Sequence, residues 1–151
     1  MQEQGDIDSI IDRYGGDKSA LIQILLDIQK EKRWVSKSAI VRISEKLGVP
    51  LGQIYQIGTF YKALSLVPQG RHQVCVCMGT ACHVRGSPRL LERVVQALDI
   101  EPGETSADQK FTLSTVNCVG CCALGPVLVV DGEYHSNPSA EETKRLVDAY
   151  D

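Results

Sequence analysis

The chain has 151 residues, of which 43% are hydrophobic and 23% charged, and its formal net charge is −3. This length suits one or two small domains that bury a core without disulfide staples. A net acidic chain does not favour a phosphate backbone, so we expect no nucleic-acid partner. No apolar run approaches the ~20 residues of a membrane span, so we expect no direct membrane insertion. The N-terminal residues lack the pattern of a targeting peptide, and we expect a cytoplasmic protein, free or attached to a membrane through a larger complex.

The first half of the chain is patterned for helices. Apolar side chains recur there at helical spacing in four stretches: 3–14, about 17–33, 37–47 and 51–64. Asp17 and Ser36 are candidate N-caps of the second and third helices, and Gly48 is a candidate stop signal. Four short helices with brief connections predict a small bundle.

The same spacing predicts which side chains of the bundle face inward. These positions are Ile7, Ile10, Ile11 and Tyr14; Leu21, Ile22, Leu25, Leu26 and Ile28; Ile40, Val41, Ile43 and Leu47; and Ile54, Ile57, Phe60, Tyr61 and Leu64. The polar residues of the bundle form no catalytic constellation.

A domain boundary is predicted at the breaker Pro68-Gln69-Gly70. Residues 1–69 then form the helical bundle, and residues 70–151 form a second domain. The second domain is the acidic one, with 7 lysines and arginines against 11 aspartates and glutamates.

Beyond the boundary the periodicity changes and indicates strands. We expect strands at His72–Met78, Phe111–Val116 and Val127–Val130 and helices at about 88–98 and 139–150. Asp131-Gly132 is a strong hairpin signal after the last of these strands. The order β-α-β-β-α describes a small α/β domain, so the fold class is α+β, with the helical bundle first.

All six cysteines lie in two short segments, residues 75–82 and 118–122. Cysteines that cluster beside glycines in a cytoplasmic protein indicate metal binding or catalysis more often than disulfides. In the first segment, Cys77 lies where the strand opens into a loop and can share a centre with Cys82. Cys75 lies about 6–7 Å further back along the strand, and we interpret it as a core residue.

The second segment offers more than one ligand pair. Cys118 can pair with Cys121 or with Cys122, and local physics leaves this choice open. Zinc sites usually separate paired cysteines by two residues, whereas the plant-type 2Fe–2S pattern has a four-residue gap like that between Cys77 and Cys82. A Rieske centre would need two histidines, and His83 has no counterpart after Cys118. The spacing favours iron–sulfur over zinc and over a thioredoxin-like dithiol.

Four motifs carry a resemblance to a known family. They are Gly58-Thr59-Phe60-Tyr61, Cys77-Met78-Gly79-Thr80-Ala81-Cys82, Gly103-Glu104-Thr105 and Cys118-Val119-Gly120-Cys121-Cys122. In order and spacing they resemble the thioredoxin-like 2Fe–2S ferredoxin family, and within it the small iron–sulfur subunits of NADH:quinone oxidoreductase and of related NAD(P)-linked hydrogenases and formate dehydrogenases. The resemblance covers nearly the whole chain.

The resemblance implies one 2Fe–2S cluster with Cys77, Cys82, Cys118 and Cys122 as ligands, in a thioredoxin-like domain. It also implies an electron-transfer subunit without catalytic residues, docked through both domains onto a subunit that binds flavin and NAD(P)H. FMN and NAD(P) would lie on that partner, and further iron–sulfur subunits would complete the assembly. A respiratory complex, a hydrogenase, a formate dehydrogenase or an electron-bifurcating enzyme would all fit. A zinc-held interaction module and a free-standing ferredoxin remain the alternatives.

Some neighbours of the presumed ligands give further expectations. Relatives often have alanine before the proline at Gly125-Pro126 and a small residue at Cys121, and we expect neither difference to touch a ligand. The backbone N–H groups of Gly79-Thr80-Ala81 can turn toward the cluster, and that of Gly120 can do so from the other side. Arg85 is expected to be solvated or to help a partner contact, as are His83 and Arg89. Thr59-Phe60-Tyr61 can serve either the partner interface or the packing of the bundle.

Overall fold

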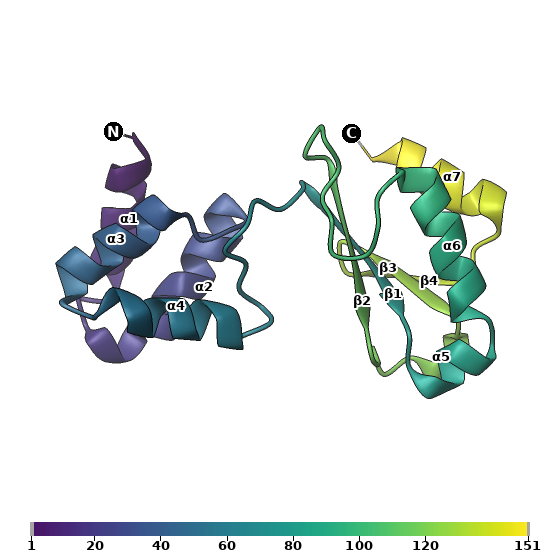
Figure 1. The fold of residues 1–151 in the computed structure, drawn as a ribbon, viewed down its shortest axis with the longest axis horizontal. Helices are drawn as coiled ribbons and strands as arrows, with labels where there is room; N and C mark the ends of the chain where they lie inside the picture. The colour runs from purple at the N-terminus through teal and green to yellow at the C-terminus, as the bar shows by residue number, and fades with distance from the viewer. Residues whose placement is uncertain (1, 151) are drawn as a thin grey trace. The chain divides into compact units, whose positions relative to one another are not determined.

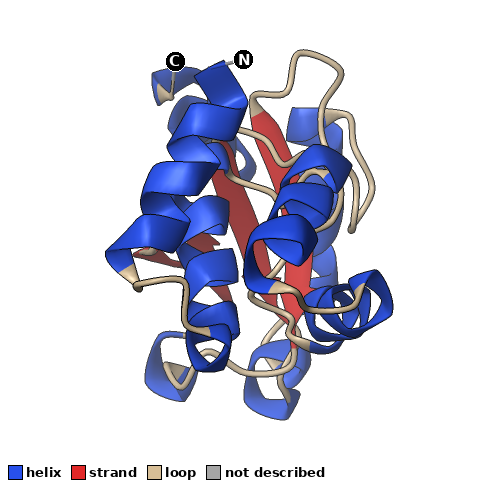
Figure 2. Cartoon of the chain, turned by 90° about the vertical axis from the view of Figure 1, so that its left-hand side faces the viewer, coloured by secondary structure: helices blue, strands red, loops and turns tan. Residues whose placement is uncertain are grey.

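The computed structural model describes the backbone of residues 2–150 and the side chains of residues 5–150. Met1, the first residue of the predicted helical bundle, and Asp151, the last residue of the predicted second domain, lie outside the described residues. The chain divides into two compact units, Met1–Gln69 and Gly70–Asp151 (Figure 1). The colouring by secondary structure in Figure 2 shows one sheet together with the helices. In the described residues, no helix combines the length and the apolar character needed to cross a membrane.

The first unit consists of four α-helices and one short 3-10 turn. They are α1 (Gln2–Arg13), the turn η1 (Lys18–Ala20), α2 (Leu21–Lys32), α3 (Lys37–Leu47) and α4 (Leu51–Phe60). The Ser36 hydroxyl accepts a hydrogen bond from the Ala39 N–H at 3.1 Å, so it is the N-cap predicted for α3. Asp17 instead caps the 3-10 turn that precedes α2. Gly48 ends α3 in the left-handed region, as predicted.

The helices enclose a core of aliphatic side chains. Its fully buried members include Ile7, Ile10, Ile11, Ile24, Leu25, Ile28, Ile40, Ile43 and Ile54. The predictions for Leu26 and Val41 are wrong, because both side chains are exposed. A helix that packs on one side buries a stripe at spacings of three and four residues, and in α2 this stripe includes Ile24 rather than Leu26.

The last helix of this unit is shorter than predicted. It ends at Phe60, and Tyr61 already has an extended backbone, so the prediction of a helix to Leu64 is wrong. Phe60 and Tyr61 were predicted to face inward, yet 80% and 40% of their surfaces are exposed. The chain folds back after them, because Leu66 packs closely over Gly58 and Leu64 is buried in the core. Leu64 reaches the core from a loop instead of from a helix.

The second unit is built on a four-stranded sheet. Its strands are β1 (His72–Cys77), β2 (Phe111–Val116), β3 (Val127–Val130) and β4 (Glu133–Ser136), and its helices are α5 (Thr80–Val84), α6 (Ser87–Leu98) and α7 (Ala140–Ala149). The spatial order is β2-β1-β3-β4, with β1 and β2 parallel and the other neighbours antiparallel. The predicted α+β fold class is confirmed, while the short helix α5 was not predicted.

Helices α6 and α7 pack on the same face of this sheet (Figure 1). Val74 and Val76 of β1 meet Leu90 and Val94 of α6 there. Alternation along a strand turns Cys77 toward the opposite face. The predicted hairpin joins β3 to β4 through two residues with positive φ, Asp131 and Gly132.

Candidate metal centre

The two cysteine-bearing segments meet at one edge of the sheet. Because β1 and β2 are parallel and Cys77 pairs with Val116, the chain leaves both strands at the same edge. The Met78 N–H extends this pairing with a 2.7 Å hydrogen bond to the Val116 carbonyl. Strand β3 runs antiparallel to β1 and therefore begins at this edge, at Val127. The segment 117–126, with its three cysteines, connects β2 to β3 beside the end of β1.

Cys77 and Cys82 form a buried pair of thiols. Only 1% and 2% of their surfaces are exposed, and they pack with Val127 in a small apolar cluster. Cys77 ends β1, and Cys82 lies in α5. The two thiols interact closely enough to shift each other's pKa. The two predicted ligands of the first segment therefore lie side by side.

Backbone N–H groups surround these sulfurs. Burial by itself raises the pKa of Cys77, but hydrogen bonds from the N–H groups of Gly79 and Val119 and from the Cys82 thiol hold it below its ordinary value. Burial, together with the hydrogen bond and the charge of Cys77, raises the pKa of Cys82. Of the two thiols, Cys77 is therefore the more acidic.

The second segment also turns a backbone donor toward sulfur. The Gly120 N–H lies 3.3 Å from the sulfur of Cys118. Gly120 can do this because its φ of +82° is accessible to glycine at little cost. Gly79 and Gly120 thus direct N–H groups to thiol sulfurs, and their direction toward a cluster, together with that of Thr80 and Ala81, stays a prediction.

The thiols of the second segment are less enclosed than those of the first. Cys118 and Cys122 are exposed, whereas Cys121 is half-buried and packs against the apolar cluster of Cys77 and Cys82. In the described residues, no three His, Cys, Asp or Glu side chains converge closely enough to hold a single metal ion. The structure therefore brings Cys77 and Cys82 together and carries Cys118 and Cys122 to the same edge without closing a four-sulfur site.

This arrangement fits a 2Fe–2S cluster in its donor chemistry. Such a cluster spreads four thiolates over two iron atoms, so it needs two pairs of sulfurs and not four around one ion. Cys77 and Cys82 are buried together in one small cluster and could supply one such pair, with backbone N–H donors of the kind that tune iron–sulfur centres beside them. The assignment of Cys77 and Cys82 as one ligand pair and of Cys118 and Cys122 as the other stays a prediction.

Two glycines allow the segments to approach closely. A Cβ atom on Gly79 would lie 2.4 Å from the carbonyl oxygen of Asn117, so only glycine fits there without a shift. A Cβ on Gly125 would lie 2.9 Å from the sulfur of Cys82. The expectation that Gly125 does not touch a presumed ligand is therefore wrong, because the turn before Pro126 packs directly on Cys82.

Sequence reasoning missed two contacts around the site. The Ser87 hydroxyl, which is fully buried, donates a hydrogen bond to the Cys77 carbonyl. The Arg85 guanidinium donates to the Cys122 and Ala123 carbonyls at 2.7 and 3.2 Å, so Arg85 is not simply solvated. Neither contact leaves a local signal, because backbone carbonyls are present at every position and the acceptors of Arg85 lie 37 and 38 residues away.

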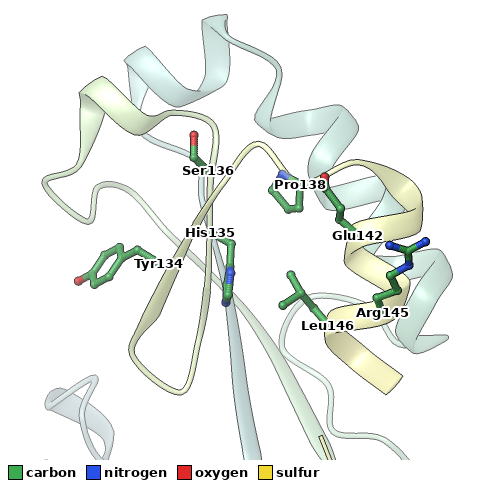
Figure 3. Close-up of a pocket in the computed structure, with 7 residues that line it drawn as sticks. All are labelled: Tyr134, His135, Ser136, Pro138, Glu142, Arg145 and Leu146. Atoms are coloured by element: carbon green, nitrogen blue, oxygen red, sulfur yellow. The ribbon is translucent and has the colours of Figure 1, made fainter. Parts of the chain in front are cut away.

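A separate groove of about 460 Å³ lies between β4 and α7. Figure 3 shows the side chains that line it: Tyr134, His135, Ser136, Pro138, Glu142, Arg145 and Leu146. The Glu142 carboxylate accepts the Ser139 N–H at 2.7 Å as part of the N-terminal cap of α7. The groove holds none of the six cysteines, so it is not the predicted centre.

The second unit has a mixed sheet with helices on one face, and its cysteine-bearing segments meet at one edge of that sheet. These features are those of a thioredoxin-like domain with a cysteine-rich centre. The model of the family described as thioredoxin-like [2Fe-2S] ferredoxin matches residues 7–151. The chain belongs to this family. The recognition drawn from the motifs is confirmed, and the family implies a 2Fe–2S cluster.

Relatives of similar length share about a third of the sequence, and all three described here are named as the same subunit of NADH-quinone oxidoreductase. The one from Pseudomonas aeruginosa is 32% identical over 148 residues, which are 98% of this chain and 89% of that protein. The one from Salmonella typhimurium is 33% identical over 137 residues, 91% of this chain and 82% of that protein. The one from Escherichia coli K12 is 31% identical over 148 residues, 98% of this chain and 89% of its own.

A solved structure has the same fold. A chain of an NAD+-reducing [NiFe]-hydrogenase in the air-oxidized state superposes with a TM-score of 0.70 and 21% identity. The match covers 85% of this chain and 22% of the hydrogenase chain. At this identity the likeness bears on the fold alone, and it supports the thioredoxin-like architecture.

Proposed function

We propose that this chain is an electron-transfer subunit of a multisubunit NAD(P)H-linked oxidoreductase. It holds one 2Fe–2S cluster on Cys77, Cys82, Cys118 and Cys122 and exchanges electrons with the FMN of a partner subunit that binds NAD(P)H. The observation that carries this proposal is the meeting of two cysteine-bearing segments at one sheet edge in a member of a 2Fe–2S family. Relatives of nearly the same length are named as subunits of NADH-quinone oxidoreductase.

The residues of the chain have distinct tasks in this proposal. When bound, a 2Fe–2S cluster accepts and releases one electron at a time. Cys77 and Cys82 supply the enclosed pair of sulfurs, and Cys118 and Cys122 supply the pair that faces solvent. The N–H donors of Gly79 and other backbone groups stabilise negative charge on sulfur and so favour the reduced state. The exposed pair gives a partner close access to the centre.

The helical unit is proposed to dock on the partner subunit. At the end of α4, Phe60 and Tyr61 border a groove of about 470 Å³ whose lining is largely apolar. A phenyl ring with 80% of its surface exposed contributes little to the packing of its own bundle. Aromatic side chains are enriched in protein interfaces, so a partner surface explains this position better than core packing does. A free-standing ferredoxin would have no use for it.

The first experiment is anaerobic expression followed by iron, sulfide and zinc analysis. We expect about two irons and two sulfides per chain. The EPR spectrum should be silent for the oxidised protein and should show a rhombic signal after reduction with dithionite. One zinc per chain without an EPR signal would contradict the proposal and would favour a zinc-held interaction module.

Docking has its own test. The chain is co-expressed with the flavin- and NAD(P)H-binding subunit of its complex, and the co-purified flavin is measured. We expect Phe60→Ser to weaken the complex while iron content stays unchanged, because Phe60 lies in the other unit from the cysteines. Val41→Ser is the matched control, since Val41 is an exposed apolar residue on α3. If the wild type, Phe60→Ser and Val41→Ser all retain the partner equally, a docking role for Phe60 is contradicted.

A further inference from the structure

Arg85 connects the two cysteine-bearing segments. It follows α5 directly, and its backbone N–H donates to the Ala81 carbonyl at 3.2 Å, which closes that helix. Its side chain reaches across to the second segment, where one guanidinium nitrogen, Nη1, donates to the carbonyls of Cys122 and Ala123 at 2.7 and 3.2 Å. One side chain thus joins the helix that carries Cys82 to the backbone of the presumed ligand Cys122.

The acceptors of these hydrogen bonds belong to a weak element. Residues Cys122–Leu124 form a single 3-10 turn, η2, held by hydrogen bonds from Leu124 to Cys121 and from Gly125 to Cys122. One such turn offers little stability of its own, because its carbonyls have few partners within the helix. A guanidinium suits this position, since its planar, multiple donors can serve two acceptors at once. The position of η2 therefore depends on a contact from outside the turn.

The positive charge of Arg85 is also not neutralised locally. In the part of the chain that the structure describes, no carboxylate forms an ion pair with Arg85. Arginine keeps its charge at all physiological pH values. A cluster held by four thiolates is anionic and becomes more negative when it takes up an electron. A fixed cation beside Cys122 interacts more favourably with the reduced form than with the oxidised form.

We propose that Arg85 is a positioning residue with two effects on the centre. It holds the backbone of Cys122 against the first cysteine segment, and its charge raises the reduction potential. This inference rests on the proposed function, because it assumes that a cluster is bound. It assigns to Arg85 a task that no sequence motif and none of the relatives' names indicates.

The test uses the full chain, loaded with its cluster, and three variants. Arg85→Gln removes the charge and shortens the reach of the side chain. Arg85→Lys keeps the charge but replaces the planar guanidinium with a single ammonium group. Arg89→Gln is the matched control, because Arg89 is another exposed arginine, four residues further along the chain at the start of α6. The readouts are the rate of iron release to a chelator and the reduction potential from a spectroscopic redox titration.

We expect the variants to separate the two effects. Arg85→Gln should release iron about 10- to 100-fold faster, the same factor by which removal of a group that orients a metal ligand usually lowers metal affinity. Its reduction potential should be more negative than that of the wild type. Arg85→Lys should also release iron faster but should keep a potential near that of the wild type. Arg89→Gln should match the wild type in both readouts.

Several results would overturn the inference. One is an Arg85→Gln protein with the iron release and the potential of the wild type. Another is an equal shift of potential in Arg85→Gln and Arg89→Gln, which would show an effect of net charge and not of position. If Arg85→Gln does not fold, the rate of iron release from Arg85→Lys tests the positioning role. A rate equal to that of the wild type would then count against that role. A wild-type chain that binds no iron and sulfide defeats the proposed function itself, which is a separate failure.

Discussion

The two cysteine-bearing segments reach the same edge of the sheet in different ways. Cys77 and Cys82 lie in regular structure, at the end of β1 and within α5, and both are almost fully buried. Cys118 and Cys122 lie in a connection that contains only one 3-10 turn, and both are exposed. The first pair is therefore placed by secondary structure and core packing, whereas the second depends on contacts made to the first.

This difference separates the part of the centre that is held firmly from the part that is open to solvent. A metal centre needs some ligands held firmly, and an electron-transfer centre also needs an open side toward its partner. In the proposed function, the enclosed pair of Cys77 and Cys82 serves the first need, and the exposed segment serves the second. The contacts of Arg85 and the close approach of Gly79 to Asn117 compensate for the weak local structure of the exposed segment.

The largest effect is expected from removing a buried thiol. Cys77→Ala or Cys82→Ala should reduce the iron content from about two atoms per chain to nearly none, because each removes a thiolate ligand from a buried apolar environment where water cannot take its place. Iron and sulfide analysis and the EPR signal of the reduced protein measure this loss. Cys75→Ala is the control and should keep the cluster, since Cys75 lies further back on β1. A full cluster in Cys77→Ala would show that the enclosed pair does not ligate.

A smaller effect is expected from the exposed segment. Cys122→Ser should keep part of its iron with an altered EPR signal, because the neighbouring Cys121 already packs against Cys77 and Cys82 and can replace the lost ligand. Cys121→Ser alone should match the wild type, and the double variant should lose the cluster. Complete loss of iron from Cys122→Ser would argue that the segment is held too firmly for Cys121 to substitute.

The smallest effect concerns stability. Gly79→Ala should lower the free energy of unfolding by about 1–3 kcal/mol, the usual cost of overpacking, because its Cβ would meet the Asn117 carbonyl. The backbone φ of Gly79 is −58°, so a clash and not backbone strain would be responsible. Gly5→Ala is the control, since Gly5 lies within α1 with open space around it, and it should stabilise by about 0.5–1 kcal/mol. Denaturant unfolding followed by circular dichroism measures both changes. A Gly79→Ala protein with the same free energy of unfolding as the wild type would refute close packing at Gly79.

The sequence predicted the elements whose causes are local. Strands Phe111–Val116 and Val127–Val130 have the predicted ends, and the hairpin at Asp131-Gly132 forms where its residues allow positive φ. The Ser36 cap is likewise a contact between neighbours in the chain. Such features follow from periodicity, capping and turn chemistry, which act over a few residues.

The errors occur where packing contacts compete with a local pattern. Phe60 and Tyr61 continue the apolar spacing of α4, yet the helix stops because the following chain folds back and packs Leu66 over Gly58. The segment after Cys77 is predicted as a loop, but its residues Thr80–Val84 form the short helix α5.

The sequence by itself determined the family and the α+β class, because the order and spacing of motifs are properties of the chain alone. The four cysteines that we expect to bind the cluster follow from the resemblance to that family and not from cysteine spacing. Only the tertiary structure decided which thiols are buried, that Gly125 packs on Cys82, and that Arg85 reaches the carbonyl of Cys122. These contacts join residues 37 to 43 positions apart. They arise because the parallel pairing of β1 and β2, and the antiparallel return of β3, bring both segments to one edge.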